Sequence, residues 1–246
     1  MRTMKHTIVI MLLLLTVTAS NAQTTSTSEA KQLLQRLADK YRNAVHLSFD
    51  IAYYYAANKM PVTYLDSLQG HFKMNGNHYW FEVAGTESLY SDQYAVVLYK
   101  EDKLMYLTKP AANITNPVAS LDDFLKADTL FTCSVTHEQD FDRLAIDFKG
   151  KSAYKRTEYY IDTHTGFITR MVSLVRSELL YDPSATPAID QANAYSIVEM
   201  QFSHYLENSF DDKALDSAQY FKKEGKEYVT VAPYDTYKIF IGSPNL

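Results

Sequence analysis

The sequence predicts a mainly β protein of the α+β class, with a single strongly curved antiparallel sheet that forms an incomplete barrel and two or three covering helices. Three observations support this. Apolar and polar residues alternate in many short runs, as strands with one buried face require. The 20 Tyr and 12 Phe favour pleated, half-buried surfaces. From Gln69 to Leu107, short turns join successive strands, as in a curved meander.

The first 22 residues have the pattern of a secretory signal peptide. Arg2 and Lys5 precede an almost unbroken apolar run, and small residues stand where a signal peptidase cuts. The run is too short for a permanent membrane anchor. Gln23 would follow the cut in place of the cysteine of a lipoprotein. We therefore expect a soluble, unacylated periplasmic protein in which residues 23–246 form a single domain.

The charge and the cysteine content limit the possible partners and the possible covalent cross-links of the protein. Without Arg2 and Lys5, 22 basic residues face 29 acidic ones, a net charge of −7. This charge argues against nucleic acid and anionic membrane surfaces as partners. Cys133 is the single cysteine, so no intramolecular disulfide is possible. Its alternation with polar neighbours predicts a buried core thiol.

The N-terminal half begins with a helix and continues with strands. Leucines at helical spacing predict an amphipathic helix from about Glu29 to Tyr41, behind a capping box at Ser26. Alternation predicts a long strand from Val45 to Tyr55 and a second from Val62 to Met74, where Gly70 indicates a bend. Further strands are expected at 78–83, 94–99 and 104–107, and a short helix at 120–126.

The C-terminal half reads as a second run of strands. We expect them at 130–136, 143–148, 158–161, 167–175 and 195–206, with final strands at 228–232 and 237–241. Asp162 to Gly166 is a clear turn. Residues 181–194 hold two prolines and predict a surface loop.

No pattern in the chain predicts catalysis or a cofactor. There is no glycine-rich phosphate loop, no nucleophile elbow and no zinc-protease motif. His71 and His78 could face each other across the hairpin at Asn75-Gly76, with Glu82 nearby, but polar residues on the wet side of a strand are the ordinary case. We therefore expect no enzyme activity, no catalytic residues and no metal.

Several motifs resemble those of the outer-membrane lipoprotein carrier (LolA/LolB-like) superfamily. The order of signal peptide, helix and long strand is similar, and so is the pattern made by Gly70, Phe72, Gly76, Tyr79, Phe81 and Glu82. Ser91-Asp92-Gln93 and Tyr99 stand at the place of a family hairpin. Residues 120–126 match a lid helix, and residues 161–168 match a late hairpin. The resemblance covers most of residues 29–206.

The resemblance implies a half-barrel that shelters acyl chains between its sheet and its helices. We expect a non-enzymatic carrier that holds a lipid or another apolar ligand. The residues expected to line its concave face are Phe49, Ile51, Phe72, Tyr79, Phe81, Val96 and Leu98. For each of them, plain core packing under a helix is the alternative. The alternative function is a structural or interaction protein of the cell envelope, with a filled interior and an envelope protein as partner.

Overall fold

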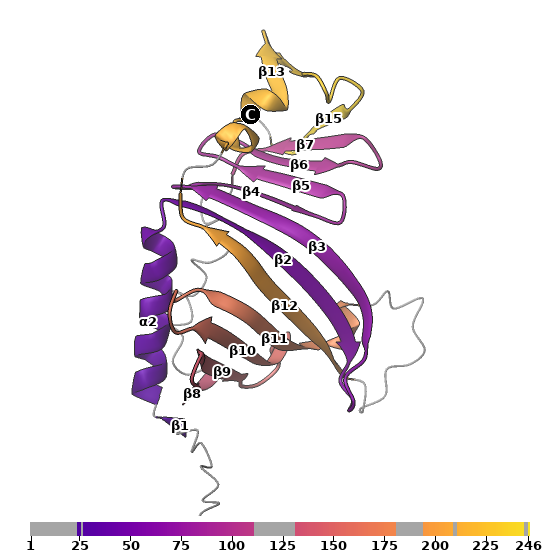
Figure 1. Ribbon diagram of the computed structural model, residues 1–246. Helices are drawn as coiled ribbons and strands as arrows, with labels where there is room; N and C mark the ends of the chain where they lie inside the picture. Colours follow the sequence, from indigo (N-terminus) through magenta and orange to yellow (C-terminus); the bar gives the residue numbers. More distant parts are fainter. Residues whose placement is uncertain (1–23, 26, 111–130, 181–193, 209–210, 244–245) are drawn as a thin grey trace, which may run out of the picture.

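The computed structural model describes residues 24–25, 27–110, 131–180, 194–208, 211–243 and 246. A large sheet of 13 strands dominates the part it describes, in the order β1-β8-β9-β10-β11-β12-β2-β3-β4-β5-β6-β7-β15. The sheet is strongly curved (Figure 1) and does not close, since β1 and β15 stand at its two ends. The expected curved, incomplete barrel is therefore confirmed in its coarse form.

The first group of elements builds one half of the sheet and the helix. Its members are β1 (Thr24–Thr25), α2 (Thr27–Asn43), β2 (His46–Ala57), β3 (Tyr64–Asn75), β4 (His78–Val83), β5 (Thr86–Tyr90), β6 (Ala95–Tyr99) and β7 (Leu104–Thr108). The second group supplies β8 (Phe131–His137), β9 (Phe141–Phe148), β10 (Tyr154–Asp162), β11 (Ile168–Arg176), η1 (Ser177–Leu179) and β12 (Tyr195–Leu206). The C-terminal segment holds η3 (Asp212–Leu215), η4 (Ser217–Gln219), β13 (Phe221–Glu224), β14 (Glu227–Thr230) and β15 (Lys238–Ile241).

Two expectations about these elements need correction. The sheet is mixed, because β15 runs parallel to β7, and β13 and β14 form a small second sheet. In place of two or three covering helices, the described part of the chain has one α-helix, α2, and short 3-10 turns. The helix expected at 120–126, the capping residue Ser26 and nearly all of the expected loop at 181–194 lie outside the described residues.

Helix α2 defines the inner face of the sheet, the face against which it packs (Figure 1). Leu33, Leu34 and Leu37 recur at helical spacing and are at most 4% exposed, which gives the helix one apolar stripe. They belong to one core cluster with sheet residues from both halves of the chain: Leu47, Phe49, Phe72, Val135, Leu144 and Ile146. Since this cluster joins the helix to strands from both halves of the chain, burial of the helix stabilises the curved sheet.

The C-terminal segment covers the opposite, outer face at the other end of the sheet. Leu215, Tyr220 and Phe221 pack in a second core cluster with outer-face residues of β4 to β7: Trp80, Leu89, Val96, Leu98, Met105 and Leu107. Each end of the sheet is thus covered on a different face. Among the described residues, no helix is long and apolar enough to cross a membrane.

Gly70 is required where β3 bends over β4. A Cβ atom at this position would lie 2.7 Å from the backbone oxygen of Glu82 and 3.3 Å from Cβ of Val83. Real Cβ atoms essentially never approach a backbone oxygen this closely. The close approach of the two strands therefore explains the glycine that the sequence pattern associated with a bend.

His137 ties the first turn of α2 to the sheet. Its Nε2 lies 2.7 Å from Oε1 of Glu29, and its Nδ1 lies 2.6 Å from Oδ1 of Asp142. The hydrogen bonds with Asp142 and Glu29 raise the pKa of the His137 imidazole above its ordinary value. A protonated His137 donates to both carboxylates and connects the helix to the β8–β9 hairpin.

This contact predicts a small pH dependence of stability. Since the pKa is raised in the folded state, the contribution is fully present below the unfolded pKa of about 6.5. It is lost as pH rises through the higher folded pKa. We expect His137→Gln to lower the free energy of unfolding by about 0.2–1 kcal/mol below about pH 6, as for an exposed ion pair, and by less above about pH 8. Urea unfolding at several pH values measures this, with His164→Gln as the control. An equal effect at both pH values would contradict it.

Candidate ligand-binding face

A row of aromatic rings crosses the inner face from strand to strand. Phe49 of β2 stacks on Phe72 of β3 with ring centroids 4.8 Å apart. Phe72 stacks on Tyr79 of β4 at 6.2 Å, and Tyr79 stacks on Tyr90 of β5 at 4.6 Å. Antiparallel pairing brings these rings together, because it places Phe49 opposite Phe72 and Tyr79 opposite Tyr90. Such cross-strand aromatic pairs stabilise a sheet beyond the area that they bury.

The structure brings five of the seven expected lining residues together. The inner face holds Phe49, Ile51, Phe72, Tyr79 and Phe81, which all belong to the core cluster under α2 or pack against it. They lie on β2, β3 and β4, at positions whose registers place them side by side.

Val96 and Leu98 lie on the outer face, so the structure corrects their expected place in the concave lining. Both are fully buried in the C-terminal cluster. The reason is β5, a strand that the sequence pattern did not indicate. Ser88 of β5 pairs with Phe81 on one side and with Val97 on the other. Val97 therefore lies on the inner face, as Phe81 does. Since side chains alternate along a strand, Val96 and Leu98 point to the outer face.

The inner face has a packed part and a half-buried part. Under α2, the side chains of Phe49, Phe72 and Tyr79 are only 3–6% exposed. Farther along β2, the strand continues with residues of intermediate burial, Ile51, Tyr53 and Tyr55. The packed part behaves as an ordinary core, so a ligand would contact the half-buried part.

Further inner-face residues extend this half-buried part, and sequence reasoning did not single them out. Their registers with β2 and its neighbours place them on the same face: Leu68 of β3, Met171 of β11, and Val198 and Met200 of β12. All four are of intermediate burial. These residues can be assigned to the inner face only when the pairing of β12 with β2 is known. No local sequence pattern predicts that pairing.

Burial raises the pKa of several tyrosine hydroxyls on this face. Desolvation raises the pKa of Tyr53 and that of Tyr90. Tyr41 of α2 shows the same effect, since burial raises its pKa to about 12, and its hydroxyl lies 2.9 Å from that of Tyr205. These phenols stay protonated at neutral pH. Tyr53, on the half-buried part of the face, therefore offers an apolar ring and a neutral hydroxyl to a ligand.

The histidines of the β3–β4 hairpin do not form a joint site. His71 pairs with Glu82, whereas His78 pairs with Asn75. His71 Nδ1 lies 2.6 Å from Asp50, and His78 Nε2 lies 3.3 Å from Asp92. Within the described ranges, no group of three or more His, Cys, Asp or Glu side chains is arranged to hold a metal ion. Cys133 is buried in the core cluster under α2.

The fold and this face define an open, strongly curved sheet with an apolar inner surface. No family model matches the chain, and no curated protein is similar to it in sequence. Among solved structures, an uncharacterized conserved protein from Thermus thermophilus is similar at 6% identity and a TM-score of 0.46, over 87% of this chain and 99% of that one.

Two further solved structures are similar over about three quarters of this chain. A LolA superfamily protein from Nitrosomonas europaea is similar at 12% identity and a TM-score of 0.34, over 79% of this chain and 99% of that one. The Mycobacterium tuberculosis lipoprotein LppX is similar at 9% identity and a TM-score of 0.36, over 75% and 99% of the two chains.

Proposed function

We propose that the protein is a non-enzymatic binding or carrier protein that holds a lipid or another apolar ligand on the inner face of its sheet. One observation carries the proposal. Beyond the packed core under α2, the described inner face continues as a half-buried apolar surface over three adjacent strands. It includes Tyr53 on β2, Leu68 on β3 and Met200 on β12. Residues 1–22 would direct export to the periplasm, and residues 23–246 would act as one domain.

The composition of this surface suits an alkyl ligand. Removing apolar area from water contributes about 25 cal/mol per Å², or about 0.8 kcal/mol per buried CH₂ group. Met171 and Met200 pair directly across β11 and β12. Unbranched methionine side chains adapt to alkyl ligands of different shape. Tyrosine rings add apolar area and keep a hydroxyl group that can contact solvent. Affinity would therefore depend on shape and area more than on any single side chain.

Two consecutive residues of β3 allow a matched test of this proposal. Leu68 lies on the inner face opposite Tyr53, whereas Ser67 lies on the outer face opposite Tyr54. We expect Leu68→Glu to weaken uptake of a fluorescent fatty acid by delipidated protein by about tenfold or more, because a carboxylate in an apolar site must be desolvated. Ser67→Glu, the control, should bind like the wild type.

Mass spectrometry of the purified protein supplies a second measurement, since a carrier should retain lipid during purification. The proposal fails if the wild type neither retains lipid nor takes up the probe. Equal uptake by Leu68→Glu and Ser67→Glu would also contradict the proposal, because the ligand would then bind elsewhere.

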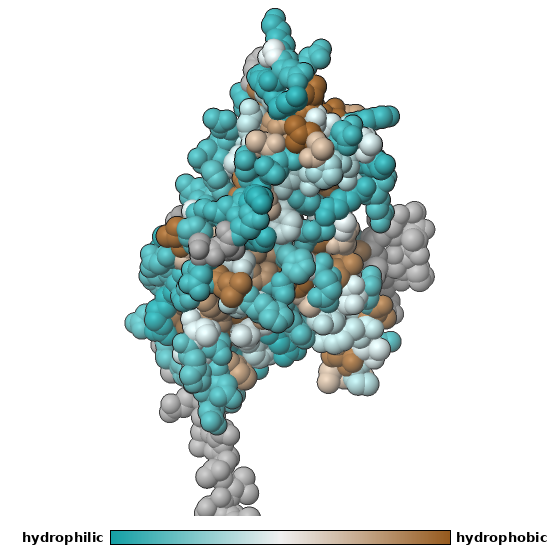
Figure 2. All heavy atoms as spheres, turned by 45° about the horizontal axis from the view of Figure 1, so that its top comes forward, coloured by the Kyte–Doolittle hydropathy of each residue, from teal (hydrophilic) through white to brown (hydrophobic). Residues whose placement is uncertain are grey.

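A second candidate is an envelope interaction protein with a filled interior. The packing of Phe49, Phe72 and Tyr79 favours it for the part under α2. An exposed aromatic group at the sheet end also favours it, since Tyr106 is 39% exposed and stacks on Phe240 of β15, which is 45% exposed. Figure 2 shows hydrophobic residues in small patches on a largely hydrophilic surface. If this candidate is correct, a stoichiometric envelope protein should bind the wild type, and Phe240→Asp should abolish the capture.

A further inference from the structure

A polar hollow lies on the outer face of the middle strands, on the side of the sheet away from the proposed lipid surface. Pairing across four strands aligns Arg170, Gln201, Ala52 and Gln69 in one row. Ala52 has the smallest side chain of the four, so the row has a depression between long polar neighbours. The resulting hollow has a volume of about 390 Å³, within the range of about 300–1,000 Å³ that is usual for small-molecule sites.

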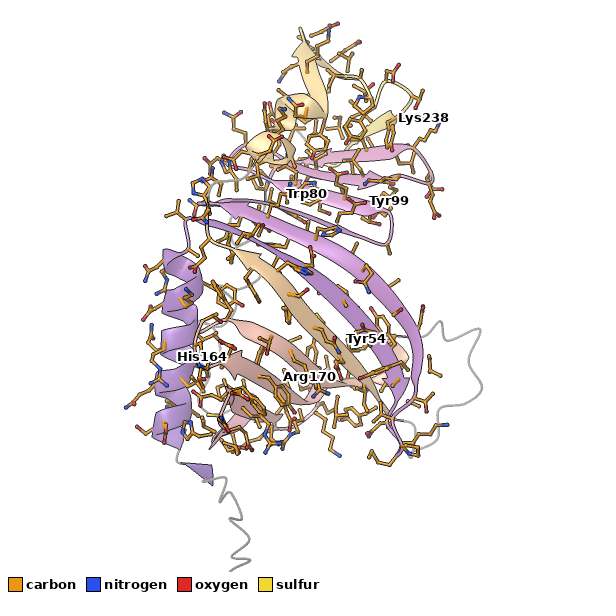
Figure 3. The ribbon with its side chains drawn as sticks, in the orientation of Figure 1. Tyr54, Trp80, Tyr99, His164, Arg170 and Lys238 are labelled. Atoms are coloured by element: carbon orange, nitrogen blue, oxygen red, sulfur yellow. The ribbon has the colours of Figure 1, made fainter. Side chains whose placement is uncertain are left out.

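The neighbouring rows supply the walls of the hollow. Tyr54, two residues along β2 from Ala52, lies on one side, and Asp50 lies on the other. Figure 3 shows Tyr54 and Arg170 on the middle strands of the sheet. The Tyr54 ring also contacts that of Tyr64, with centroids 4.9 Å apart. The hollow therefore combines an aromatic ring with hydrogen-bonding groups on three sides.

A buried carboxylate orients the polar side chains of the hollow. Glu199, which is 3% exposed, accepts hydrogen bonds from Arg170 Nε at 2.9 Å and Nη2 at 2.7 Å. It also accepts one from Gln201 Nε2 at 2.9 Å and one from the Tyr64 hydroxyl at 2.7 Å. Among the described residues, these bonds leave Nη1 of Arg170 and the amide oxygen of Gln201 for a ligand. Because two hydrogen bonds to Glu199 fix the guanidinium of Arg170, this group is pre-organised and loses little conformational entropy when it binds a ligand.

The charges around the hollow argue against an ionic ligand. Arg170 is neutralised by Glu199, whose pKa stays lowered because hydrogen bonds from Arg170, Gln201 and Tyr64 outweigh the effect of burial. The carboxylate of Asp50 is hydrogen-bonded by His71 and His204, at 2.6 and 2.8 Å. This second carboxylate would repel an anion, and its histidine partners already occupy both of the oxygens that a cation would need. A neutral ligand with many hydroxyl groups meets neither penalty.

We propose that the hollow over Ala52 is a binding site for a neutral saccharide of one or two sugar units. The amides of Gln69 and Gln201 and the guanidinium of Arg170 are planar groups that donate to or accept from sugar hydroxyls. The Tyr54 ring offers an apolar surface to the C–H face of the sugar. This site is independent of the lipid proposal, since it uses the other face of the sheet.

Filling the hollow gives the sharpest test. Isothermal titration calorimetry with glucose, N-acetylglucosamine, maltose, cellobiose and chitobiose should detect saturable binding of at least one sugar by the wild-type protein. Ala52→Phe adds a ring at the centre of the hollow and should weaken that binding by about tenfold or more, as overpacking of a site does. Thr132→Phe places the same ring at an exposed position of β8, away from the hollow, and should bind like the wild type.

A second variant tests the proposal independently, in case Ala52→Phe does not fold. Gln69→Leu keeps the size of an exposed side chain and removes its amide, which should weaken binding by several-fold through the lost hydrogen bonds. Circular dichroism and urea unfolding check that each variant is folded. Absence of binding for every sugar at millimolar concentration would overturn the proposal. So would wild-type affinity in folded Ala52→Phe and Gln69→Leu.

Discussion

Replacing Glu87 by alanine is expected to lower the free energy of unfolding by about 1–3 kcal/mol, the cost of leaving a buried donor without its charged acceptor. Glu87 is 5% exposed. Its Oε1 accepts hydrogen bonds from Trp80 Nε1 and from the Tyr220 hydroxyl, both at 2.7 Å. Its Oε2 lies 3.2 Å from Nζ of Lys100. The substitution removes the acceptor of the buried Trp80 Nε1 group. It also removes one of the two acceptors of the Tyr220 hydroxyl, which keeps the Ala214 oxygen, and so weakens the anchor of the C-terminal segment on the outer face.

The measurement for Glu87→Ala can be local as well as global. Trp80 is the single tryptophan of the chain, so its fluorescence reports on this network. We expect its emission to shift to longer wavelength, and the urea unfolding midpoint to fall. Glu101→Ala, in the exposed turn between β6 and β7, is the control and should change the free energy of unfolding by less than about 0.5 kcal/mol. A Glu87→Ala protein as stable as this control would contradict the anchoring role.

Leu34→Ala is expected to lower the free energy of unfolding by about 2–5 kcal/mol, the usual cost of a cavity at a fully buried leucine. Leu34 is 0% exposed on α2 and belongs to the cluster that joins both halves of the sheet. The cost should lie in the upper part of the range, because the surrounding strands are fixed by their ladders and cannot collapse into the cavity.

The matched control for Leu34→Ala is Arg36→Ala on the same helix. Arg36 is exposed, and arginine and alanine have similar helix propensities, so the expected change is below about 0.5 kcal/mol. Urea unfolding compares the two variants, and dye binding tests whether the inner face becomes accessible in Leu34→Ala. Similar stability of both variants would show that α2 does not hold the sheet together.

Local periodicity was enough to predict much of the fold. The strand expected at 45–55 is β2 (His46–Ala57), and the helix expected near 29–41 is α2 (Thr27–Asn43). Both elements have one buried face, so their sequences repeat with the period of their geometry. For the same reason, the five expected lining residues on β2 to β4 share one face.

The strand β5 escaped prediction because its turn has an unusual sequence. Ala84 and Gly85 connect β4 to β5, and both have positive φ angles, 48° and 75°. Hairpin turns of this kind normally use asparagine, aspartate or glycine at both positions. An alanine there carries no such signal. The omission of one strand reversed the expected orientation of β6, which is why Val96 and Leu98 were expected on the inner face although pairing with β5 places them on the outer one.

The remaining features depend on contacts between distant parts of the chain. The outer-face cluster needs Leu215 and Tyr220 to meet residues of β4 to β7, and the half-buried inner face needs β12 to lie beside β2. Nothing in the local sequence of either segment encodes its partner. The run from Ala95 to Leu98 is apolar throughout, so its alternation could not identify the buried face.

The place of β12 in the sheet has a consequence for folding. Residues 46–108 and 131–176 can each form a local meander, and within the described sheet the strand that pairs with both is β12, which lies between β11 and β2. The edge strand β15 also comes from the last part of the chain and pairs with β7. Pairing over such long sequence separations is slow. A nascent chain of this protein therefore cannot complete its sheet until nearly all of it has been synthesised, so the finished sheet forms late and its two outer parts can fold before it.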